Sequence, residues 1–274
     1  MRQIAAHPRE GRSPMKYSTS TSYEKSTQTR TFEHPIRVSV IVPTYQERGS
    51  IGDLIEQTSI VMKGWDYEIV VVDDDSPDGT AEYAASFADR HPVRVITRQG
   101  IRGLGSAVIE GCRHAEGTLI AVVDADLQHP PEVVPRLAKA IEDGADIAVA
   151  SRYVDGGGVK GWSLLRRLIS RGAILLARPL TDLKDPMSGC FMLTRPVLVE
   201  DEVNGRGYKL LLEILVKSHY NRATEVPYIF ECRRNGKSKL GAKEYARYSK
   251  LLLELYLYKL SSRLRGRQAR MPEN

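Results

Sequence analysis

Runs of β-branched and apolar residues alternate with amphipathic stretches from position 36 onward, and few folds accommodate that alternation. The runs are apolar throughout, which is typical of strands buried on both faces of a parallel sheet. The predicted strands are Val38–Val42, Glu68–Val72, Val93–Thr97, Leu119–Val123 and Ile147–Ala150. The predicted helices between them are Ile51–Met62, Ala81–Asp89, Ser106–Ala115 and Glu132–Glu142. The pattern therefore predicts an α/β domain with a central, mostly parallel sheet.

The remaining segments set the expected domain boundaries. Further apolar segments lie near Leu164–Ala177, Phe191–Leu193, Leu210–Val216 and Val226–Phe230, but the pattern leaves their order in the sheet open. Residues 1–35 contain ten Ser and Thr residues and no apolar periodicity, which predicts a disordered tail without a secretory signal. We expect a tail over 1–35, the α/β domain over 36–241, and a basic amphipathic helix and tail over 242–274.

The net charge of +6 is unevenly distributed along the chain. Residues 231–274 contain 12 basic and four acidic residues, a net charge of +8, and the preceding residues carry −2. Six leucines accompany these basic residues between positions 251 and 260. An apolar basic helix favours a membrane surface or a partner subunit over nucleic acid. Because every long apolar stretch is interrupted by charges, no helix is expected to cross a bilayer.

Acidic residues follow the fourth predicted strand, where ligands of open α/β sheets bind. Asp124 and Asp126 are two residues apart, so both carboxylates of an extended segment face one side, and Gln128 continues that alternation. Such an all-oxygen set suits Mg²⁺ or Mn²⁺ and does not suit zinc. An aspartate N-cap of the next helix is the alternative, but the position directly after a buried strand favours a metal site. His129 is expected at the start of that helix and not as a ligand.

Two other polar segments are candidates for binding. Asp73 and Asp74 end the second strand, and a turn with its helix cap at 78–80 does not explain two adjacent carboxylates there. These carboxylates suit the N–H edge of a base or a ribose hydroxyl. Asp185 opens a loop through Gly189 that is either part of an active site or a turn with Gly189 at positive φ.

Several coupled motifs, in order, resemble glycosyltransferase family 2, and within it the polyprenyl-phosphate (dolichyl-phosphate) mannosyltransferases. The segments are VSVIVPTYQE, VVVDDDSPDGT, RGLGSA, AVVDADLQHPPE, ASRY, DPMSGCFM and RRNGKSKLG, and they extend over 36–241. The resemblance implies a GT-A fold, a nucleotide-sugar donor (commonly GDP-mannose), Mg²⁺ or Mn²⁺, and inverting transfer to a polyprenyl or dolichyl phosphate. Glucosyl transfer from UDP- or GDP-glucose, and a glycan acceptor, stay open as alternatives.

The resemblance also implies roles for residues that contact the donor. The nucleoside would be held by Pro43, Tyr45, Glu47 and Asp74. The metal ion and the donor diphosphate would be held by Asp124, Asp126 and Gln128. The donor phosphates would also contact Arg233 and Lys239, with Arg234 as a competitor for the first position.

The acceptor phosphate is expected to bind arginines, whose forked donors fit phosphate oxygens. The candidates are Arg152, Arg166 and Ser170, with Arg167 and Arg171 as an alternative pair at the same helical spacing. A phosphate is already ionised at neutral pH, so it can attack an anomeric carbon without a general base. The expected catalytic residues are Asp126, Arg152 and Asp185.

Other classes of protein fit the sequence less well. A dinucleotide-binding fingerprint should follow the first strand, where Pro43 and Thr44 stand instead. A P-loop would need glycine at position 231, which is glutamate. A basic membrane-binding or nucleic-acid-binding module is the non-enzymatic alternative. The favoured hypothesis is a glycosyltransferase peripheral to the cytoplasmic face of a membrane, held by its basic helix or by a membrane partner subunit.

Overall fold

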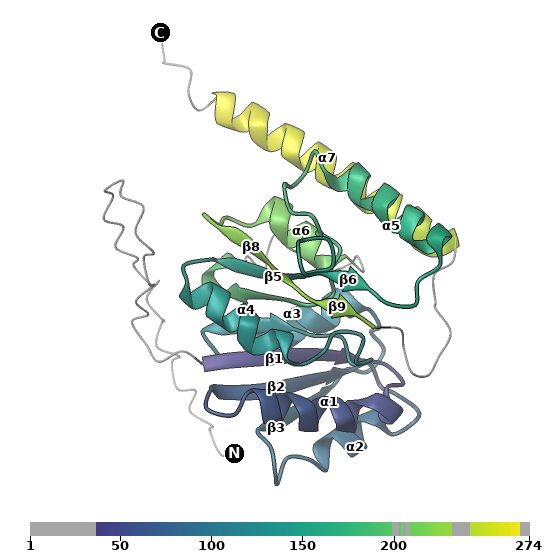
Figure 1. The fold of residues 1–274 in the computed structure, drawn as a ribbon, viewed down its shortest axis with the longest axis vertical. Helices are drawn as coiled ribbons and strands as arrows, with labels where there is room; N and C mark the ends of the chain where they lie inside the picture. Colours follow the sequence, from purple (N-terminus) through teal and green to yellow (C-terminus); the bar gives the residue numbers. More distant parts are fainter. Residues whose placement is uncertain (1–36, 199–202, 204, 206–208, 232–241, 269–274) are drawn as a thin grey trace, which may run out of the picture.

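Valine and isoleucine fill the first strands because branched side chains pack well on a pleated surface. The structure is a computed structural model that describes residues 37–198, 203, 205, 209–231 and 242–268. Within this part of the chain, seven strands form one sheet in the order β3-β2-β1-β4-β7-β5-β8 (Figure 1). They are β1 (Arg37–Thr44), β2 (Asp66–Asp73), β3 (Val93–Thr97), β4 (Leu119–Val122), β5 (Ile147–Ser151), β7 (Phe191–Thr194) and β8 (Ala223–Pro227). A second, two-stranded sheet pairs β6 (Gly158–Val159) with β9 (Ile229–Phe230).

Strand β7 is the exception in a sheet that is otherwise parallel. It pairs antiparallel with both β4 and β5. All other neighbours pair parallel, namely β1 with β2 and β4, β2 with β3, and β5 with β8. Because β4 and β5 both run opposite to β7, their carboxyl ends meet at the same edge as those of β1 and β2. The predicted mostly parallel sheet is confirmed, and β7 occupies a place that the apolar pattern left open.

Helices cover both faces of the large sheet. The described helices are α1 (Arg48–Val61), α2 (Thr80–Ala85), α3 (Leu104–His114), α4 (Val133–Glu142), α5 (Leu164–Ala177), α6 (Leu210–Lys217) and α7 (Ala242–Gln268), with a 3-10 turn at Arg195–Val197. Of these, α1, α2 and α4 pack on one face of the large sheet, and α3 and α6 pack on the other. Successive strand residues point to opposite faces. Val40 packs in one cluster with Leu54 of α1 and Leu137 of α4, whereas Ile41 packs in another with Val108 of α3. Both faces are therefore buried, as the continuous apolar runs predict.

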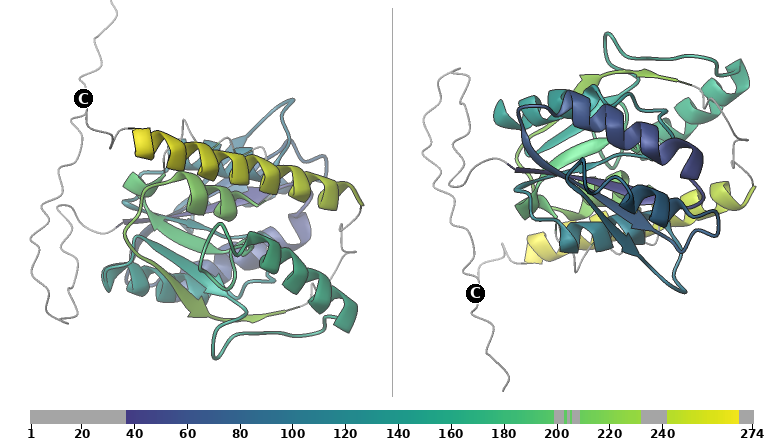
Figure 2. Two further views of the ribbon diagram at one scale, coloured as in Figure 1. Left: turned by 90° about the horizontal axis from the view of Figure 1, so that it is seen from above. Right: turned by 90° about the horizontal axis from the view of Figure 1, so that it is seen from below.

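Helix α7 packs beside α5 and α6 through a third apolar cluster. Leu251 and Leu255 of α7 are buried in this cluster together with Ile174 of α5. The Tyr248 and Tyr256 hydroxyls donate to carbonyl oxygens of α5, at 2.7 and 2.6 Å. Figure 2 shows α7 lying along the outside of the molecule next to α6. Among the described residues, no helix combines the length and apolar character that a bilayer crossing requires.

Helix α2 is shorter than predicted. It ends at Ala85, whereas the apolar spacing predicts a helix that extends to Asp89. From Phe87 onward the backbone forms tighter turns, with the Phe87 N–H donating to Ala84 and the Ala88 N–H to Ala85. A proline follows at position 92, and the residue before a proline disfavours helical backbone.

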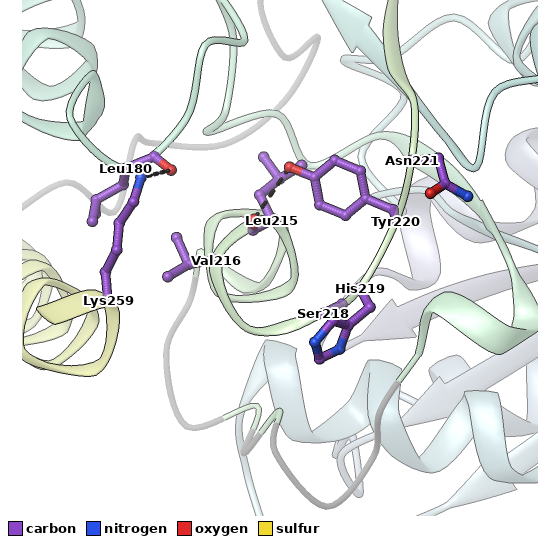
Figure 3. Close-up of a pocket in the computed structure, with 8 residues that line it drawn as sticks. All are labelled: Leu180, Leu215, Val216, Ser218, His219, Tyr220, Asn221 and Lys259. Atoms are coloured by element: carbon purple, nitrogen blue, oxygen red, sulfur yellow. Dashed lines mark hydrogen bonds between the residues drawn. The ribbon is translucent and has the colours of Figure 1, made fainter. Parts of the chain in front are cut away.

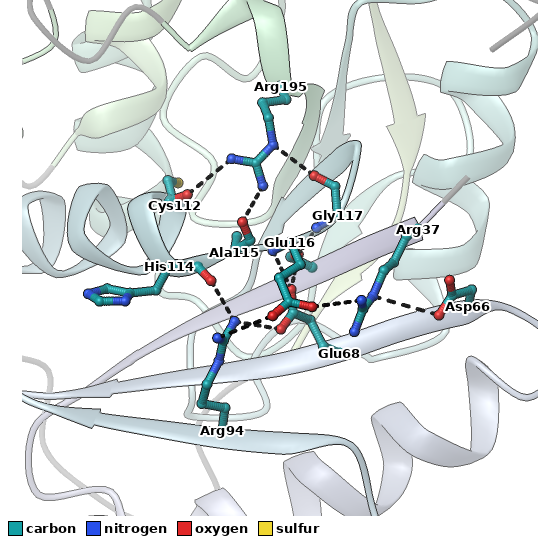
Figure 4. Close-up of polar contacts among 11 residues, drawn as sticks. Arg37, Asp66, Glu68, Arg94, Cys112, His114, Ala115, Glu116, Gly117 and Arg195 are labelled. Atoms are coloured by element: carbon teal, nitrogen blue, oxygen red, sulfur yellow. Dashed lines mark hydrogen bonds and ion pairs between the residues drawn. The ribbon is translucent and has the colours of Figure 1, made fainter. Parts of the chain in front are cut away.

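A polar network joins the amino ends of the strands, at the edge opposite the strand-end carboxylates (Figure 4). The carboxylate of Glu68 is buried and accepts hydrogen bonds from the Ser39 hydroxyl, the Glu116 N–H and the Arg94 guanidinium, at 2.6, 2.6 and 2.7 Å. Arg37 also bonds Glu116, at 2.7 Å. This network fixes β1, β2 and β3 against the end of α3.

Candidate functional site

The candidate site lies at the carboxyl edge of the sheet, where the loops after β1, β2, β4 and β5 come together. The Asp74 N–H donates to the Thr44 carbonyl, which ties the end of β2 to the end of β1. The Val123 N–H donates to the Ile41 carbonyl, which does the same for β4. The sheet topology thus places the residues that follow each strand in one region, as the general rule for open α/β sheets predicts.

The predicted nucleoside residues line the first two of these loops. Asp74 is buried and accepts hydrogen bonds from the Arg98 side chain and, at 2.8 Å, from the Gly103 N–H. Arg102 lies over the Tyr45 ring, with its Cζ 4.4 Å from the ring centroid. The loop after β3, which carries Arg98 and Arg102, therefore reaches both predicted residues. Arg98 and Arg102 were not predicted from the sequence, because the apolar pattern of β3 does not indicate that the loop after it lies over the ends of β1 and β2.

Pro43 and Glu47 flank Tyr45 and are positioned by the backbone. Pro43 is buried near the end of β1, in register with Val72 of β2. The Glu47 N–H donates to the Thr80 hydroxyl at 3.1 Å, and its carboxylate accepts from Ser50 at 3.0 Å. Asp73, which precedes Asp74, is fully buried, and its carboxylate accepts hydrogen bonds from the Ser76 N–H and hydroxyl in the turn after β2. We therefore assign the structural part of the Asp73–Asp74 pair to Asp73.

The Asp124–Gln128 segment forms a tight turn beyond β4. Asp126 Oδ1 accepts the Gln128 N–H at 3.0 Å, and Leu127 between them has a φ of 57°. Helix α4 follows only after Glu132, which makes no side-chain cap. The alternative interpretation of an aspartate N-cap is therefore wrong.

The carboxylate of Asp124 lies directly against Gly189. A Cβ on Gly189 would overlap the Asp124 carboxylate, at 2.9 Å from its Cγ. Gly189 is not among the glycines at positive φ, so the interpretation of a turn that needs positive φ there is wrong. Glycine is required by the close approach of Asp124. This contact brings the Asp185–Gly189 loop to the Asp124–Gln128 turn, as the active-site interpretation of that loop predicts.

The oxygen ligands at the Asp124–Gln128 turn suit a hard divalent cation. Two carboxylates and one amide oxygen are the ligands that Mg²⁺ or Mn²⁺ takes when substrate phosphates complete its coordination. Among the described residues, no group of three or more His, Cys, Asp or Glu side chains is placed to hold a metal by itself. A metal here would therefore depend on oxygen ligands from the substrate in addition to Asp124, Asp126 and Gln128.

Arg152 and Asp185 form a buried ion pair. The Arg152 Nε and Nη2 donate to the two oxygens of Asp185 at 2.7 and 2.6 Å, and the Arg152 N–H donates to Oδ2 at 2.9 Å. Asp185 is fully buried, and burial would lower the pKa of Arg152, but the bonds and charge of Asp185 raise it above its ordinary value. The pair leaves the Nη1 amino group as the part of Arg152 not bonded to Asp185.

Aromatic residues connect Arg152 to the other predicted acceptor residues. Arg166 lies over the Trp162 ring at 4.2 Å, and Arg152 approaches the same ring at 5.4 Å. The Tyr153 hydroxyl is 2.9 Å from the Ser170 hydroxyl. The predicted set of Arg152, Arg166 and Ser170 is therefore brought together, whereas the alternative Arg167 is exposed and donates to the Val159 carbonyl.

Lys209, which is half-buried, and His129, which is buried, lie in the same region and were not predicted as functional residues. The Lys209 ammonium group donates to the Met187 carbonyl at 3.3 Å. Burial and the Arg152 charge lower the pKa of Lys209 to about 8, although the charges of Asp124 and Asp185 act to raise it. Burial, with Arg152 and Lys209, lowers the pKa of His129 to about 3, so this ring is neutral. His129 Nδ1 is 3.7 Å from the Asp124 carboxylate. These shifts show that the groups occupy one electrostatic environment.

Arg233 and Lys239, together with the alternative Arg234, lie outside the described residues. The neighbouring Glu231 is described, and its N–H donates to the Gln128 carbonyl at 3.2 Å. The chain therefore enters the predicted donor-phosphate segment directly beside the Asp124–Gln128 turn.

A cavity of about 560 Å³ lies elsewhere, between the end of α6 and α7 (Figure 3). It is lined by Leu180, Leu215, Val216, Ser218, His219, Tyr220, Asn221 and Lys259. None of the predicted site residues lines it, and Lys259 uses its ammonium group to bond the Pro179 and Leu180 carbonyls. We assign the candidate site to the carboxyl edge of the sheet and not to this cavity.

Known sequences resemble the chain over most of its length. The profile described as Glycosyl transferase family 2 matches residues 39–200. The chain is 49% identical over 220 residues to the dolichol-phosphate mannosyltransferase of Pyrococcus furiosus, a match that covers 78% of this chain and 62% of that protein. It is 40% identical over 240 residues to the dolichol-phosphate mannosyltransferase of Saccharomyces cerevisiae, covering 83% and 90%. The chain thus spans less than two thirds of the Pyrococcus relative.

Solved structures share the fold at lower sequence identity. Glucosyl-3-phosphoglycerate synthase from Mycobacterium tuberculosis, crystallised with Mn²⁺, UDP-glucose and phosphoglyceric acid, matches with a TM-score of 0.58 at 20% identity, covering 82% of this chain and 79% of that one. The same enzyme with Mg²⁺ and UDP gives a TM-score of 0.60 at 19% identity, with the same coverage. The predicted GT-A fold is confirmed.

Proposed function

Because the chain belongs to glycosyl transferase family 2, and is a glycosyltransferase, we propose that it transfers a hexose from a nucleotide sugar to a polyprenyl phosphate such as dolichyl phosphate. The observation that carries the proposal is the pairing of two kinds of group at one sheet edge. Asp124 and Asp126 suit a nucleotide diphosphate with its cation, and Arg152 with Arg166 suits a second, separate phosphate. An enzyme that transfers a sugar from a nucleoside diphosphate to an acceptor phosphate needs both.

GDP-mannose is the proposed donor. The relatives named as dolichol-phosphate mannosyltransferases support mannose, and UDP- or GDP-glucose is the alternative, since a structural neighbour holds UDP-glucose. Pro43, Tyr45, Glu47 and Asp74 would contact the nucleoside at the ends of β1 and β2. The Arg102–Tyr45 pair offers a flat surface beside this position, onto which a base can stack.

Asp124, Asp126 and Gln128 are the residues that would hold Mg²⁺ or Mn²⁺ together with the donor diphosphate. When bound, the cation would neutralise the charge that develops on the leaving diphosphate. Structural neighbours crystallised with Mn²⁺ or Mg²⁺ support a divalent ion, and the all-oxygen donor set fits one. Arg233 and Lys239 would contact the same diphosphate from outside the described residues.

The chemistry assigned to the chain is an inverting displacement. An acceptor phosphate oxygen forms a bond to the anomeric carbon of the hexose while the bond from that carbon to the diphosphate breaks, and the nucleoside diphosphate leaves. Arg166, Ser170 and the Nη1 group of Arg152 would orient the acceptor phosphate. Asp185 would act on this step by fixing the Arg152 guanidinium.

The acceptor is a lipid, and α5 presents a surface that suits a membrane. Six large apolar side chains of α5 are between 41% and 78% exposed: Leu164, Leu165, Leu168, Ile169, Leu175 and Leu176. The neighbouring α7 exposes Leu253, Leu257 and Leu260. Arginines alternate with these residues on α5, as expected for a helix at an anionic lipid surface. We propose that α5 and α7 dock on the cytoplasmic face of a membrane; recruitment by a membrane partner subunit is the alternative.

A donor screen tests the proposed reaction. The purified chain is incubated with GDP-mannose, GDP-glucose or UDP-glucose and a polyprenyl phosphate, with Mn²⁺, with Mg²⁺ or with a chelator. We expect hexosyl transfer to the lipid from GDP-mannose, dependent on the cation and abolished in Asp126→Asn. Transfer to a soluble glycan and not to the lipid would contradict the acceptor assignment, and full activity in the chelator would contradict the metal assignment.

A further inference from the structure

Trp162 connects the two arginines of the predicted acceptor-phosphate site. The Cζ atoms of Arg166 and Arg152 are 4.2 and 5.4 Å from the centroid of its ring. Both distances lie within the range in which a guanidinium is attracted to an indole face. Phe230 meets the same indole edge-on, at 5.3 Å and 70°. Both guanidinium groups therefore contact this one ring.

Two guanidinium groups at one ring repel each other unless an anion lies near them. The repulsion between the two guanidinium groups is stronger here because Trp162 directly precedes Ser163, the N-cap of α5. The amino end of a helix carries partial positive charge, and the first turn of α5 contains Arg166 and Arg167 and no acidic residue. Positive charge is thus concentrated at this point, and the Asp185 carboxylate, which is bonded to Arg152, offsets part of it.

The indole N–H of Trp162 adds a donor at the same point. Its Nε1 is buried and has no hydrogen-bond partner among the described residues. A buried donor without an acceptor is costly, and most such groups in proteins are bonded. An anion placed between the two guanidinium groups would supply the acceptor.

We propose that Trp162 is a phosphate ligand and positioning residue of the acceptor site. Its ring holds the Arg152 and Arg166 guanidinium groups so that both face one phosphate, and its Nε1–H donates to an oxygen of that phosphate. This assignment rests on the proposed function, because it takes the phosphate to be that of a polyprenyl phosphate. Tyr228 and His129 have similarly buried polar atoms without partners among the described residues, and their rings stack on each other.

Fluorescence tests the contact without requiring transfer. The chain has two tryptophans, and Trp65 lies just before β2, at the opposite edge of the sheet. Trp65→Phe leaves Trp162 as the single indole, and Trp162→Phe leaves Trp65 as the matched control. We expect geranyl phosphate to change the emission of the Trp65→Phe protein saturably, with no effect of geraniol and no response in the control. A Trp162 signal that geranyl phosphate leaves unchanged would overturn the proposal.

Kinetics separate phosphate binding from packing. Trp162→Leu removes the ring, and Trp162→Phe keeps a ring but removes the N–H. We expect Trp162→Leu to raise KM for the polyprenyl phosphate about tenfold or more, and Trp162→Phe by a smaller factor, with KM for the nucleotide sugar unchanged. Equal increases in both KM values, or an unchanged acceptor KM in Trp162→Leu, would overturn the assignment. If Trp162→Leu fails to fold, Trp162→Phe and the fluorescence titration decide the question.

The two experiments distinguish this proposal from the proposed function. A saturable fluorescence response to geranyl phosphate without transfer from any donor would overturn the proposed reaction and support the phosphate contact at Trp162. Transfer to polyprenyl phosphate without any fluorescence response would support the reaction and overturn the role of Trp162.

Discussion

At the residue scale, the Arg152–Asp185 pair makes a strong prediction about stability. Asp185→Asn would leave the guanidinium buried without its counter-charge, and breaking such a pair by removing one partner costs about 3 kcal/mol or more. We expect the free energy of unfolding, measured by urea titration, to fall by that amount. Asp182→Asn, an exposed aspartate three residues earlier, is the matched control and should stay within about 0.5 kcal/mol of the wild type. A loss in both variants would contradict the assignment to the buried pair.

Gly189 makes a second prediction, about the position of Asp124. In Gly189→Ala the new Cβ overlaps the Asp124 carboxylate, so that carboxylate must move. We expect hexosyl transfer to fall by about tenfold or more at saturating Mn²⁺, since a small misplacement at a reacting centre is costly. Gly172→Ala in α5 is the control, because its Cβ would meet nothing within 4 Å. Gly189→Ala with wild-type activity would show that Asp124 does not need its observed position.

The amino-edge network predicts how stability depends on pH. Burial would raise the pKa of Glu68, but Ser39, the Glu116 N–H, Arg94 and Arg37 hold it below 4.5, the usual value. The ionised form therefore stabilises the fold above pH 4.5, and this contribution is lost as pH falls below 4.5. We expect Glu68→Gln to lower the free energy of unfolding at pH 7 by roughly 2 kcal/mol. The difference from the wild type should narrow below pH 4.5.

The exposed Glu56→Gln serves as the control for this prediction. Glu56 makes one weak surface pair, at 4.0 Å from Arg90, and such pairs contribute little to stability. A gap between Glu68→Gln and the wild type that stays constant from pH 7 to pH 3 would contradict the stabilising role of the ionised carboxylate.

The candidate site could be predicted from the sequence where a local rule applies. Asp74, Asp124 and Arg152 directly follow strands, and the sheet brings such residues to one edge whatever their partners are. Trp162 and Lys209 directly follow none of the five predicted strands and were missed. Their place in the site depends on contacts with residues distant in the chain, such as the Trp162–Phe230 contact, and periodicity carries no information about those.

At the element scale, the first five strands were predictable because each is a continuous apolar run between helices. Strand β7 was recognised only as an apolar segment, because its place between β4 and β5 follows from pairing and not from its own four residues. The two-residue strands β6 and β9 are too short to show any period. Tertiary contacts therefore set the part of the fold that the pattern leaves open.

Helix α7 allows a matched test of packing between elements. Leu255 is fully buried against α5, whereas Leu257, two residues later, is 57% exposed. We expect Leu255→Ala to lower the free energy of unfolding by about 2–4 kcal/mol because it leaves a cavity. Leu257→Ala should change it by less than about 1 kcal/mol. Urea unfolding followed by circular dichroism measures both, and equal losses would contradict the packing of α7 onto the domain.

At the scale of the whole molecule, α7 belongs to the basic segment of the sequence and also shares an exposed apolar surface with α5. The net charge of +8 lies in residues 231–274, and the exposed leucines lie on α5 and α7, which pack against each other. Either feature alone gives weak attachment to a membrane, because stable anchoring generally needs two signals. Together they support docking through a helix that also holds part of the proposed phosphate site, since Arg166 and Ser170 are residues of α5.

This coincidence predicts how the chain binds vesicles. We expect cosedimentation with vesicles of phosphatidylglycerol and phosphatidylcholine, weakened at high salt because exposed charges are screened. Leu165→Glu with Leu168→Glu should lower the partition coefficient at least about tenfold, because two exposed leucines can no longer enter the lipid. Ile60→Glu is the control, since Ile60 is 72% exposed on α1, away from this surface. If Ile60→Glu weakens binding as much as the double variant, the contact is not specific to α5. If neither variant weakens binding, the apolar face of α5 does not enter the membrane.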